Sequence, residues 1–130
     1  MITFLLVVFG IVSNAAASVL IKYAMMPERK VSISDPLSII LNIPLWAGLL
    51  LYGIAFVLYA LTLQRLPLNV THPVLTCGAI SMVAVLSVIL FGESFTTTKI
   101  IGVVLVAIGV ILISCSSSNY LISYSSNYLI

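Results

Sequence analysis

The chain has 130 residues, of which 62% are hydrophobic and only 6% are charged. Soluble domains carry about 25% charged residues, so this composition excludes an ordinary soluble fold and favours a membrane protein. The formal net charge of +2 is also far from the strongly basic surface that nucleic-acid binding requires, so no nucleic-acid partner is expected.

Four apolar runs of roughly 15 to 22 residues are long enough to cover most or all of a hydrocarbon core about 30 Å thick. They predict an all-α membrane protein, a four-transmembrane-helix bundle that occupies residues 1–114. The helices are expected at about residues 2–22, 45–63, 70–91 and 98–114. Residues 115–130 repeat a short polar motif and are expected to form a poorly ordered tail. Such a bundle leaves no room for a catalytic domain, so no enzyme, cofactor or metal is predicted.

The first apolar run carries small and polar residues at every fourth position. Gly10, Asn14, Ser18 and Lys22 therefore lie along one side of a helix. In lipid such a stripe faces protein or water, because acyl chains offer polar side chains no partner. No Lys or Arg precedes the run, and it is too long for the core of a signal peptide. We therefore expect a membrane helix whose Asn14, Ser18 and Lys22 are candidate substrate-binding residues.

The second and third runs add three further candidates. Tyr52 and Tyr59 are seven residues apart and so share nearly one helical face, where they either pack against neighbours or contact a substrate. His72 is the only side chain with an ordinary pKa near neutrality, and it is either an interfacial hydrogen-bonding group or a proton relay. Pro73 is expected in the first turn of the third helix, where its missing N–H is harmless.

The fourth run carries Gly102 and Gly109 on one face, seven residues apart. Small residues let another helix backbone approach closely in a membrane, so both glycines are candidates for a dimer interface. Glu93, in the connector before this run, is expected to be a solvated carboxylate at the level of the lipid headgroups.

Basic residues are distributed unevenly between the two sides of the expected bundle. The first and third connectors carry Lys22, Arg29, Lys30 and Lys99, whereas the opposite side carries Arg65. The positive-inside rule places these two connectors in the cytoplasm and both termini outside.

Residues 63–113 resemble the small multidrug resistance proteins of the drug/metabolite transporter (EamA-like) superfamily. The likeness rests on the Leu-Pro turn at 66–67, on Phe91-Gly92-Glu93 and on the glycine-bearing stretch 102–110. The end of the first helix, at residues 19–22, matches too, so the resemblance covers residues 1 to about 114. It implies a multi-pass protein of the bacterial inner membrane that works as a homodimer or as a heterodimer with a paralogous four-helix subunit.

The resemblance also implies roles for individual residues. The first three helices of each subunit would line a substrate chamber, and the fourth helices would pair through Gly102 and Gly109. Drug exporters of this family carry a glutamate in the first helix, eight residues before the lysine, where this chain has Asn14. An amide does not titrate, so the familial exchange of a proton for a drug is not available.

One branch of this family lacks that glutamate, namely the flippase subunits for aminoarabinose-phosphoundecaprenol. This chain resembles the branch in its turn from Leu63 to Pro67 and in Pro73 early in the third helix. It departs from the branch at His72, where an aromatic residue is usual, so the identity of the substrate stays open.

Three functions remain after this comparison. The first is a flippase subunit for a polyprenyl-phosphate-linked sugar or a similar lipid-linked, amphipathic substrate. The second is an exporter of cationic drugs or small molecules. The third is a non-transporting accessory subunit of a membrane glycosyltransferase.

Overall fold

The computed structural model describes the backbone of residues 1–29 and 31–128, and the side chains of residues 1–29 and 31–119. Lys30, which the sequence counts among the cytoplasmic cations, lies outside the described residues, as do Leu129 and Ile130 of the expected tail. Within the described part, four helices are long and apolar enough to cross a membrane, and no strand is present. The predicted all-α membrane fold is therefore confirmed, while the dimer stays a prediction.

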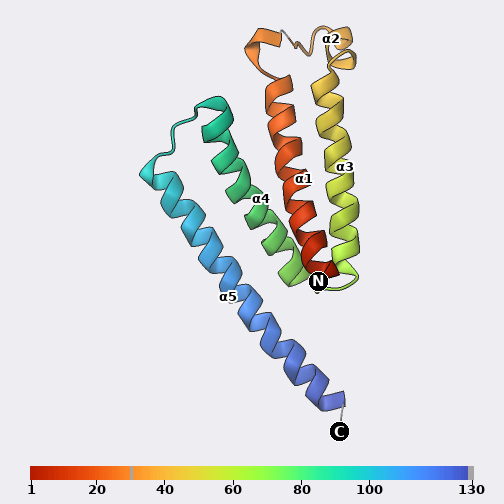
Figure 1. The fold of residues 1–130 in the computed structure, drawn as a ribbon, viewed down its shortest axis with the longest axis vertical. Coiled ribbons are helices and arrows are strands. Elements are labelled where there is room, and N and C mark those ends of the chain that lie inside the picture. The colour runs from red at the N-terminus through yellow and green to blue at the C-terminus, as the bar shows by residue number, and fades with distance from the viewer. Residues whose placement is uncertain (30, 129–130) are drawn as a thin grey trace.

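The four long helices run up and down in antiparallel order (Figure 1). They are α1 (Ile2–Ala24), α3 (Ile43–Leu63), α4 (Leu68–Phe91) and α5 (Thr97–Tyr128). The bounds of the first three lie within two residues of the predicted ones. By contrast, α5 continues well past residue 114, where the sequence was expected to end the helix. Residues 115–128 contain no Gly or Pro, and Ser and Asn weaken a helix only mildly.

The connector between α1 and α3 contains a short 3₁₀ helix, η1 (Pro27–Arg29), and the small helix α2 (Pro36–Ile40). Asn42 ends this connector with a side chain that is only 7% exposed. Its Nδ2 donates to the Ala24 carbonyl at 3.0 Å, and its Oδ1 accepts from the Leu45 backbone N–H at 3.3 Å. One amide therefore caps the start of α3 and ties it to the end of α1.

Helices α1 and α3 pack closely because small residues meet at their interface. A Cβ atom on Gly48 would lie 2.8 Å from Ile21 Cγ1 and 3.1 Å from the Ala17 carbonyl oxygen, so only glycine fits there. The buried hydrophobic residues of the described bundle are also small, and most are alanines. Close approach of backbones through small residues is the usual way in which membrane helices associate.

Helix α4 packs against the other side of α1. The Ile11 side chain fills the space that a side chain on Gly78 would need. The prediction that Pro73 lies in the first turn of this helix was wrong, because α4 begins at Leu68 and Pro73 is the sixth residue of the helix. A proline at that position removes the hydrogen bond to the carbonyl of Asn69, so the helix tolerates one lost backbone bond there.

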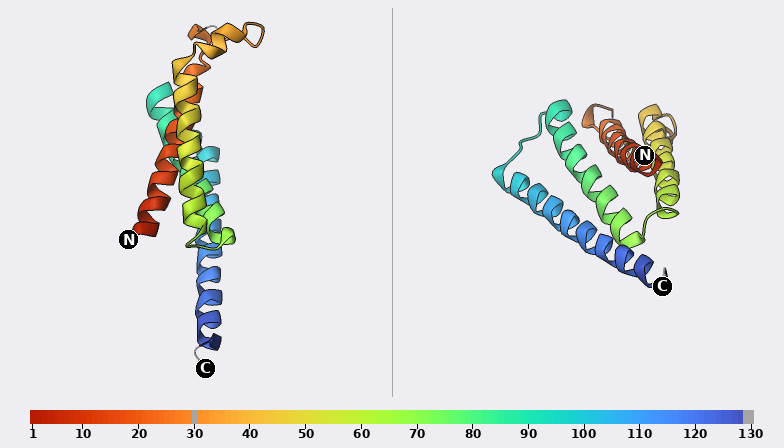
Figure 2. Two further views of the ribbon diagram at one scale, coloured as in Figure 1. Left: turned by 90° about the vertical axis from the view of Figure 1, so that its right-hand side faces the viewer. Right: turned by 60° about the horizontal axis from the view of Figure 1, so that its bottom comes forward.

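Helix α5 leans away from the other three helices and packs mainly against α4 (Figures 1 and 2). The connector before it begins at Gly92, whose φ of 62° is the left-handed conformation that glycine adopts without strain at the end of a helix. Near the other end of α4, Asn69 Nδ2 donates to Ser117 Oγ on α5 at 3.2 Å. The two helices therefore meet near the start of α4 and diverge toward the connector.

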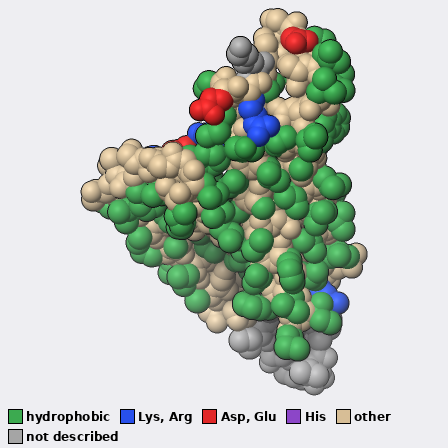
Figure 3. Space-filling model, turned by 45° about the horizontal axis from the view of Figure 1, so that its top comes forward, with side chains coloured by type: hydrophobic (Ala, Val, Ile, Leu, Met, Phe, Trp, Pro, Cys, Tyr) green, Lys and Arg blue, Asp and Glu red, His purple; other side chains and the backbone are tan. Residues whose placement is uncertain are grey.

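Apolar side chains dominate the flanks of the molecule, whereas charged side chains gather mainly near the connectors (Figure 3). In the span Thr97–Asn119 of α5, only 6% of the most apolar window is buried within the chain. Such a surface is stable in a bilayer, where lipid or another membrane protein covers it. The chain is therefore an integral membrane protein.

Candidate functional site

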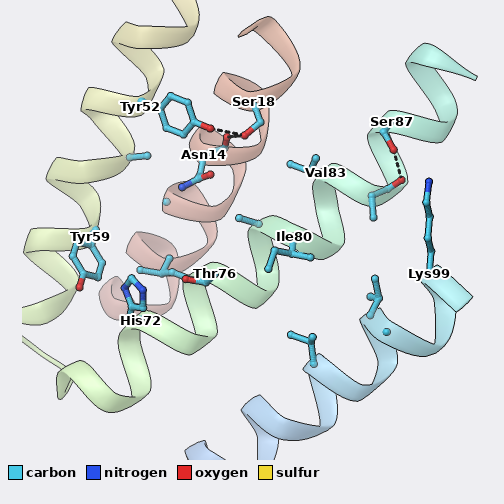
Figure 4. A pocket seen from close by; sticks show the side chains of 18 of the residues that line it. Asn14, Ser18, Tyr52, Tyr59, His72, Thr76, Ile80, Val83, Ser87 and Lys99 are labelled. Carbon is cyan, nitrogen blue, oxygen red and sulfur yellow. Dashed lines mark hydrogen bonds between the residues drawn. The ribbon is translucent and has the colours of Figure 1, made fainter. Parts of the chain in front are cut away.

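A cleft of about 1010 Å³ opens among α1, α3, α4 and α5, with polar and apolar side chains on different parts of its wall (Figure 4). The polar side chains come mostly from α1, α3 and the start of α4. These are Asn14, Ser18, Tyr52, Tyr59, His72 and Thr76, and the end of α4 and the start of α5 add Ser87 and Lys99. The apolar side chains come largely from the diverging parts of α4 and α5, and they include Ile80, Val83, Val103 and Val106. The cleft therefore offers two different environments to one ligand.

Ser18 connects α1 to α3 on the polar side of the cleft. Its hydroxyl donates to the Asn14 backbone carbonyl at 3.0 Å and lies 2.8 Å from the Tyr52 hydroxyl. Since a serine has one proton to donate, Tyr52 is the donor in the second bond. This arrangement leaves the Tyr52 oxygen as an acceptor that faces the cleft.

Tyr59 and His72 lie beside each other near the turn between α3 and α4 (Figure 4). Their ring centroids are 5.8 Å apart and the rings are inclined by 70°, an edge-to-face arrangement. His72 is exposed and is the histidine of the cleft wall. The geometry places it where it can offer a hydrogen-bond donor or acceptor to a ligand.

The structure brings most of the sequence-predicted residues together. Asn14, Ser18, Tyr52, Tyr59 and His72 line the same cleft, although they come from three different helices. Their role in binding stays a prediction.

Lys22 is not among the residues that line the cleft, although the sequence placed it on the same stripe as Asn14 and Ser18. Its Nζ instead lies 2.7 Å from Glu93 Oε1, in the connector between α4 and α5, and 5.6 Å from the centre of the Phe91 ring. The hydrogen bond from Lys22 and its charge hold the pKa of Glu93 below the ordinary value, and Lys99 adds to this effect. Glu93, expected to be a solvated carboxylate, is thus half-exposed and paired.

Sequence reasoning missed Lys99, which lines the cleft from the first turn of α5. Its Nζ donates to the Ser94 carbonyl at 3.0 Å. Helical periodicity could have indicated Lys99 as a lining residue. It precedes Gly102 by three residues and Val106 by seven, so the three residues share one face of the helix. Ser87 on α4 was missed as well, and no pattern in the sequence distinguished it.

The two glycines of the expected dimer interface face open space. Among the described residues, nothing lies within 4 Å of a Cβ atom built on Gly102 or on Gly109. Gly102 also lines the cleft, which the sequence did not indicate. Both glycines are therefore available to a partner helix, and their pairing stays a prediction.

The charge of the cleft wall is positive. Among the residues that the structure describes, Lys99 is the charged side chain that lines the cleft, and no carboxylate lines it. Asn14 is neutral at any pH. The wall therefore offers hydrogen bonds and a cation to a ligand.

Comparison with known proteins finds relatives among resistance proteins and flippase subunits. The chain is 35% identical over 71 residues to the quaternary ammonium compound-resistance protein QacG of a Staphylococcus strain, which is 55% of this chain and 66% of that protein. It is 32% identical over 65 residues to the multidrug resistance protein EbrA of Bacillus licheniformis, which is 50% of this chain and 62% of that protein. The aligned stretches thus span less than two thirds of these resistance proteins.

A longer match joins the chain to the probable 4-amino-4-deoxy-L-arabinose-phosphoundecaprenol flippase subunit ArnF of Sodalis glossinidius. The two are 29% identical over 115 residues, or 81% of this chain and 85% of that protein. No family model matches the chain, and no solved structure matches it. With the four apolar helices, these relatives support a membrane transporter similar to the small multidrug resistance proteins. The wider superfamily stays a prediction.

Proposed function

We propose that this chain is a subunit of a flippase that moves a polyprenyl-phosphate-linked sugar, or a similar lipid-linked anion, across the bacterial inner membrane. The observation that supports this most is the cleft, whose wall joins hydrogen-bonding groups, a cation and an apolar side. A substrate with a sugar, a phosphate and a lipid chain needs all three. No covalent chemistry is required of the protein.

The polar wall suits the sugar. A sugar that crosses hydrocarbon without hydrogen bonds pays a large desolvation cost, so a transporter must replace the lost water. Asn14, Tyr52 and His72 offer donors and acceptors from three helices around one space. Their arrangement suits a ligand with several hydroxyl groups.

The apolar wall suits the lipid chain. Ile80 and Val83 on α4 face the cleft together with Val103 and Val106 on α5, in the part where the two helices diverge. A prenyl chain does not need to leave hydrocarbon during transport, so the cleft has to enclose only the headgroup. The chain can remain along this wall.

The charge of the wall favours an anion over a cation. Lys99 attracts phosphate, and Asn14 on the same wall is neutral. The resemblance to drug exporters implies a carboxylate at the position of Asn14 in those proteins. Phosphate binds ammonium groups through charge-assisted hydrogen bonds, which are stronger than neutral ones.

Transport requires that the cleft open alternately to the two sides, and we propose that two subunits do this together. Gly102, which also lines the cleft, and Gly109 on α5 would contact the partner, which is a second copy or a paralogous subunit. The connectors on either side of the bundle then set the orientation. The first and third connectors would lie in the cytoplasm and both termini outside.

The proposal can be tested with protein reconstituted into liposomes that contain a short-chain prenyl phosphate bearing a fluorescent sugar. A membrane-impermeant quencher reports how fast the label moves between leaflets. We expect wild-type protein to speed this movement clearly, and Asn14→Ala to slow it about fivefold, the equivalent of one hydrogen bond. Val12→Ala, on the exposed side of the same helix, is the matched control. Movement at the protein-free rate would contradict the proposal.

Export of a cationic drug is the second candidate, because aromatic rings also line the cleft. Tyr52, Phe56, Tyr59 and Phe95 offer faces that attract quaternary ammonium groups. QacG and EbrA, which are resistance proteins by name, are similar to this chain. Proton release when a quaternary ammonium compound is added to purified protein would favour this function. Its loss in Glu93→Gln or His72→Ala would identify the coupling group.

A further inference from the structure

Charged groups from three elements gather where the cleft meets the connector between α4 and α5. Lys22, at the end of α1, lies 2.7 Å from Glu93 Oε1. Lys99, at the start of α5, lines the cleft, and its Nζ donates to the carbonyl of Ser94, the residue after Glu93, at 3.0 Å. Two ammonium groups therefore contact neighbouring residues of one connector, and with the single carboxylate of Glu93 the three groups carry a net positive charge.

The contact between Lys22 and Glu93 is open to replacement. The side chains are 55% and 36% exposed, and exposed ion pairs contribute little to stability because water and salt screen them. Glu93 lies in the connector that follows Gly92 rather than in a rigid helix. An anion that two lysines bind at once is thus able to compete with one glutamate.

The hydrogen bonding of Lys99 also favours an anionic ligand. Its Nζ donates to the Ser94 carbonyl, a single neutral acceptor, at 3.0 Å. An ammonium group has three protons to donate, and it binds an anionic oxygen more strongly than a neutral carbonyl. The Ser87 hydroxyl lines the cleft beside Lys99, but it donates its one proton to the Ala84 carbonyl at 2.9 Å (Figure 4).

We propose that Lys22 and Lys99 form a phosphate-headgroup site at this end of the cleft, and that Glu93 is its built-in competitor, which holds Lys22 until the anion replaces it. The site takes the phosphate group of a lipid-linked substrate, with Lys99 as the ligand inside the cleft and Lys22 at its edge. This inference rests on the proposed function, since it assumes an anionic lipid-linked substrate.

The exchange has a structural consequence. The Lys22–Glu93 pair ties the end of α1 to the connector that leads into α5. When an anion takes Lys22 from Glu93, this tie opens, and α1 is no longer held to the connector. Headgroup binding and the opening of this one contact are then one event, while α1 stays packed against α3 and α4.

Binding of dodecyl phosphate to the purified full-length protein in neutral maltoside micelles tests the site. Removal of the competitor in Glu93→Gln should tighten binding, whereas Lys22→Gln and Lys99→Gln should each weaken it about tenfold, the effect of a lost charge-assisted hydrogen bond. The double variant Glu93→Gln with Lys22→Gln should not bind dodecyl phosphate more tightly than wild type. The gain in affinity of the single Glu93 variant depends on Lys22, which the double variant lacks. Lys22→Arg should retain most of the wild-type affinity, which separates a binding role from failed folding.

Matched controls come from charged residues away from the cleft wall. Glu28→Gln removes an exposed carboxylate in the first connector, and Arg65→Gln removes a cation at the other end of the bundle. Neither should change the affinity. Inorganic phosphate serves as the second ligand, and it should bind far more weakly than dodecyl phosphate. Equal binding of the two would overturn the lipid-linked part of the proposal.

Failure of this inference is distinguishable from failure of the proposed function. If wild-type protein binds dodecyltrimethylammonium but not dodecyl phosphate, the anionic substrate is wrong and both proposals fail. If it binds dodecyl phosphate but Glu93→Gln does not bind it more tightly, Glu93 is no competitor and only this inference fails.

Discussion

Helices α1 and α3 form a tight pair, whereas α5, with an equally apolar sequence, packs mainly on α4 and leaves most of its surface exposed. Both regions contain glycines on one face, yet the glycines have different surroundings. Ile21 and the backbone of Ala17 occupy the space beside Gly48 of α3, whereas no described residue lies within 4 Å of a Cβ atom built on Gly102 or Gly109 of α5. Glycine thus allows two helices of the chain to pack closely in the α1–α3 pair, whereas on α5 it lies on a surface that no other helix in the described part of the chain covers.

The difference indicates which helices the chain joins closely by itself. The α1–α3 pair is joined by close packing at Gly48 and by hydrogen bonds such as the Ser18–Tyr52 bond. The α5 surface requires lipid or a partner. We therefore expect substitutions in the α1–α3 pair to change the stability of one subunit, and substitutions on α5 to change its assembly with a partner.

The largest effect is expected from Gly48→Leu. A leucine would collide with Ile21 and with the Ala17 carbonyl, and overpacking of this kind costs about 1–3 kcal/mol. The free energy of unfolding in mixed detergent micelles measures it. Gly53→Leu on the same helix is the matched control, because nothing lies within 4 Å of a Cβ atom there. An equal loss in both variants would show that α3 does not depend on close packing at Gly48.

The second largest effect is expected on the affinity of the proposed dimer. Gly102→Leu combined with Gly109→Leu should leave the stability of one subunit unchanged, because both positions are open. The double variant should raise the dissociation constant of the dimer about tenfold, or about 1.4 kcal/mol, since leucine prevents close approach of helices. Energy transfer between labelled subunits in liposomes measures this constant. A dimer of unchanged affinity would show that α5 does not form the interface.

Two asparagines provide a smaller test of the same comparison. Asn42 is buried and bonds both α1 and α3, so Asn42→Ala should cost about 1–2 kcal/mol of unfolding free energy. Asn69 makes its bond to Ser117 from an exposed position, and Asn69→Ala should cost about 0.5–1 kcal/mol. Unfolding in mixed micelles gives both values. The reverse order would mean that α4 and α5 are the more tightly joined pair.

The smallest effect concerns pH. The pKa of Glu93 is lowered in the folded protein by Lys22, so the pair stabilises the fold above the ordinary pKa of a glutamate. This stabilisation should be lost as the pH falls from that ordinary value through the lower folded-state pKa. The change in unfolding temperature should be slight, because the pair is exposed, and it should be smaller in Glu93→Gln. Identical pH profiles for the two proteins would show that the pair contributes nothing.

Much of the fold was predictable because membrane helices are encoded locally. Length and apolar composition identify a spanning helix, and each of α1, α3 and α4 was expected within two residues of its bounds. The end of α5 was not predictable from polarity, since a serine-rich stretch without Gly or Pro can continue a helix. The position of Pro73 was misjudged because the start of α4 was placed two residues late.

For the candidate site, the sequence alone identified residue types and faces. The stripe of Asn14 and Ser18 and the pair Tyr52 and Tyr59 follow from helical periodicity, which is a local property. Only the tertiary structure decided that these residues and His72 share a cleft, that Lys22 pairs with Glu93 and that Lys99 lines the wall. These contacts join residues far apart in the chain, and they depend on how the helices cross. The crossing is fixed by packing at positions such as Gly48 and Gly78, which no local pattern reports.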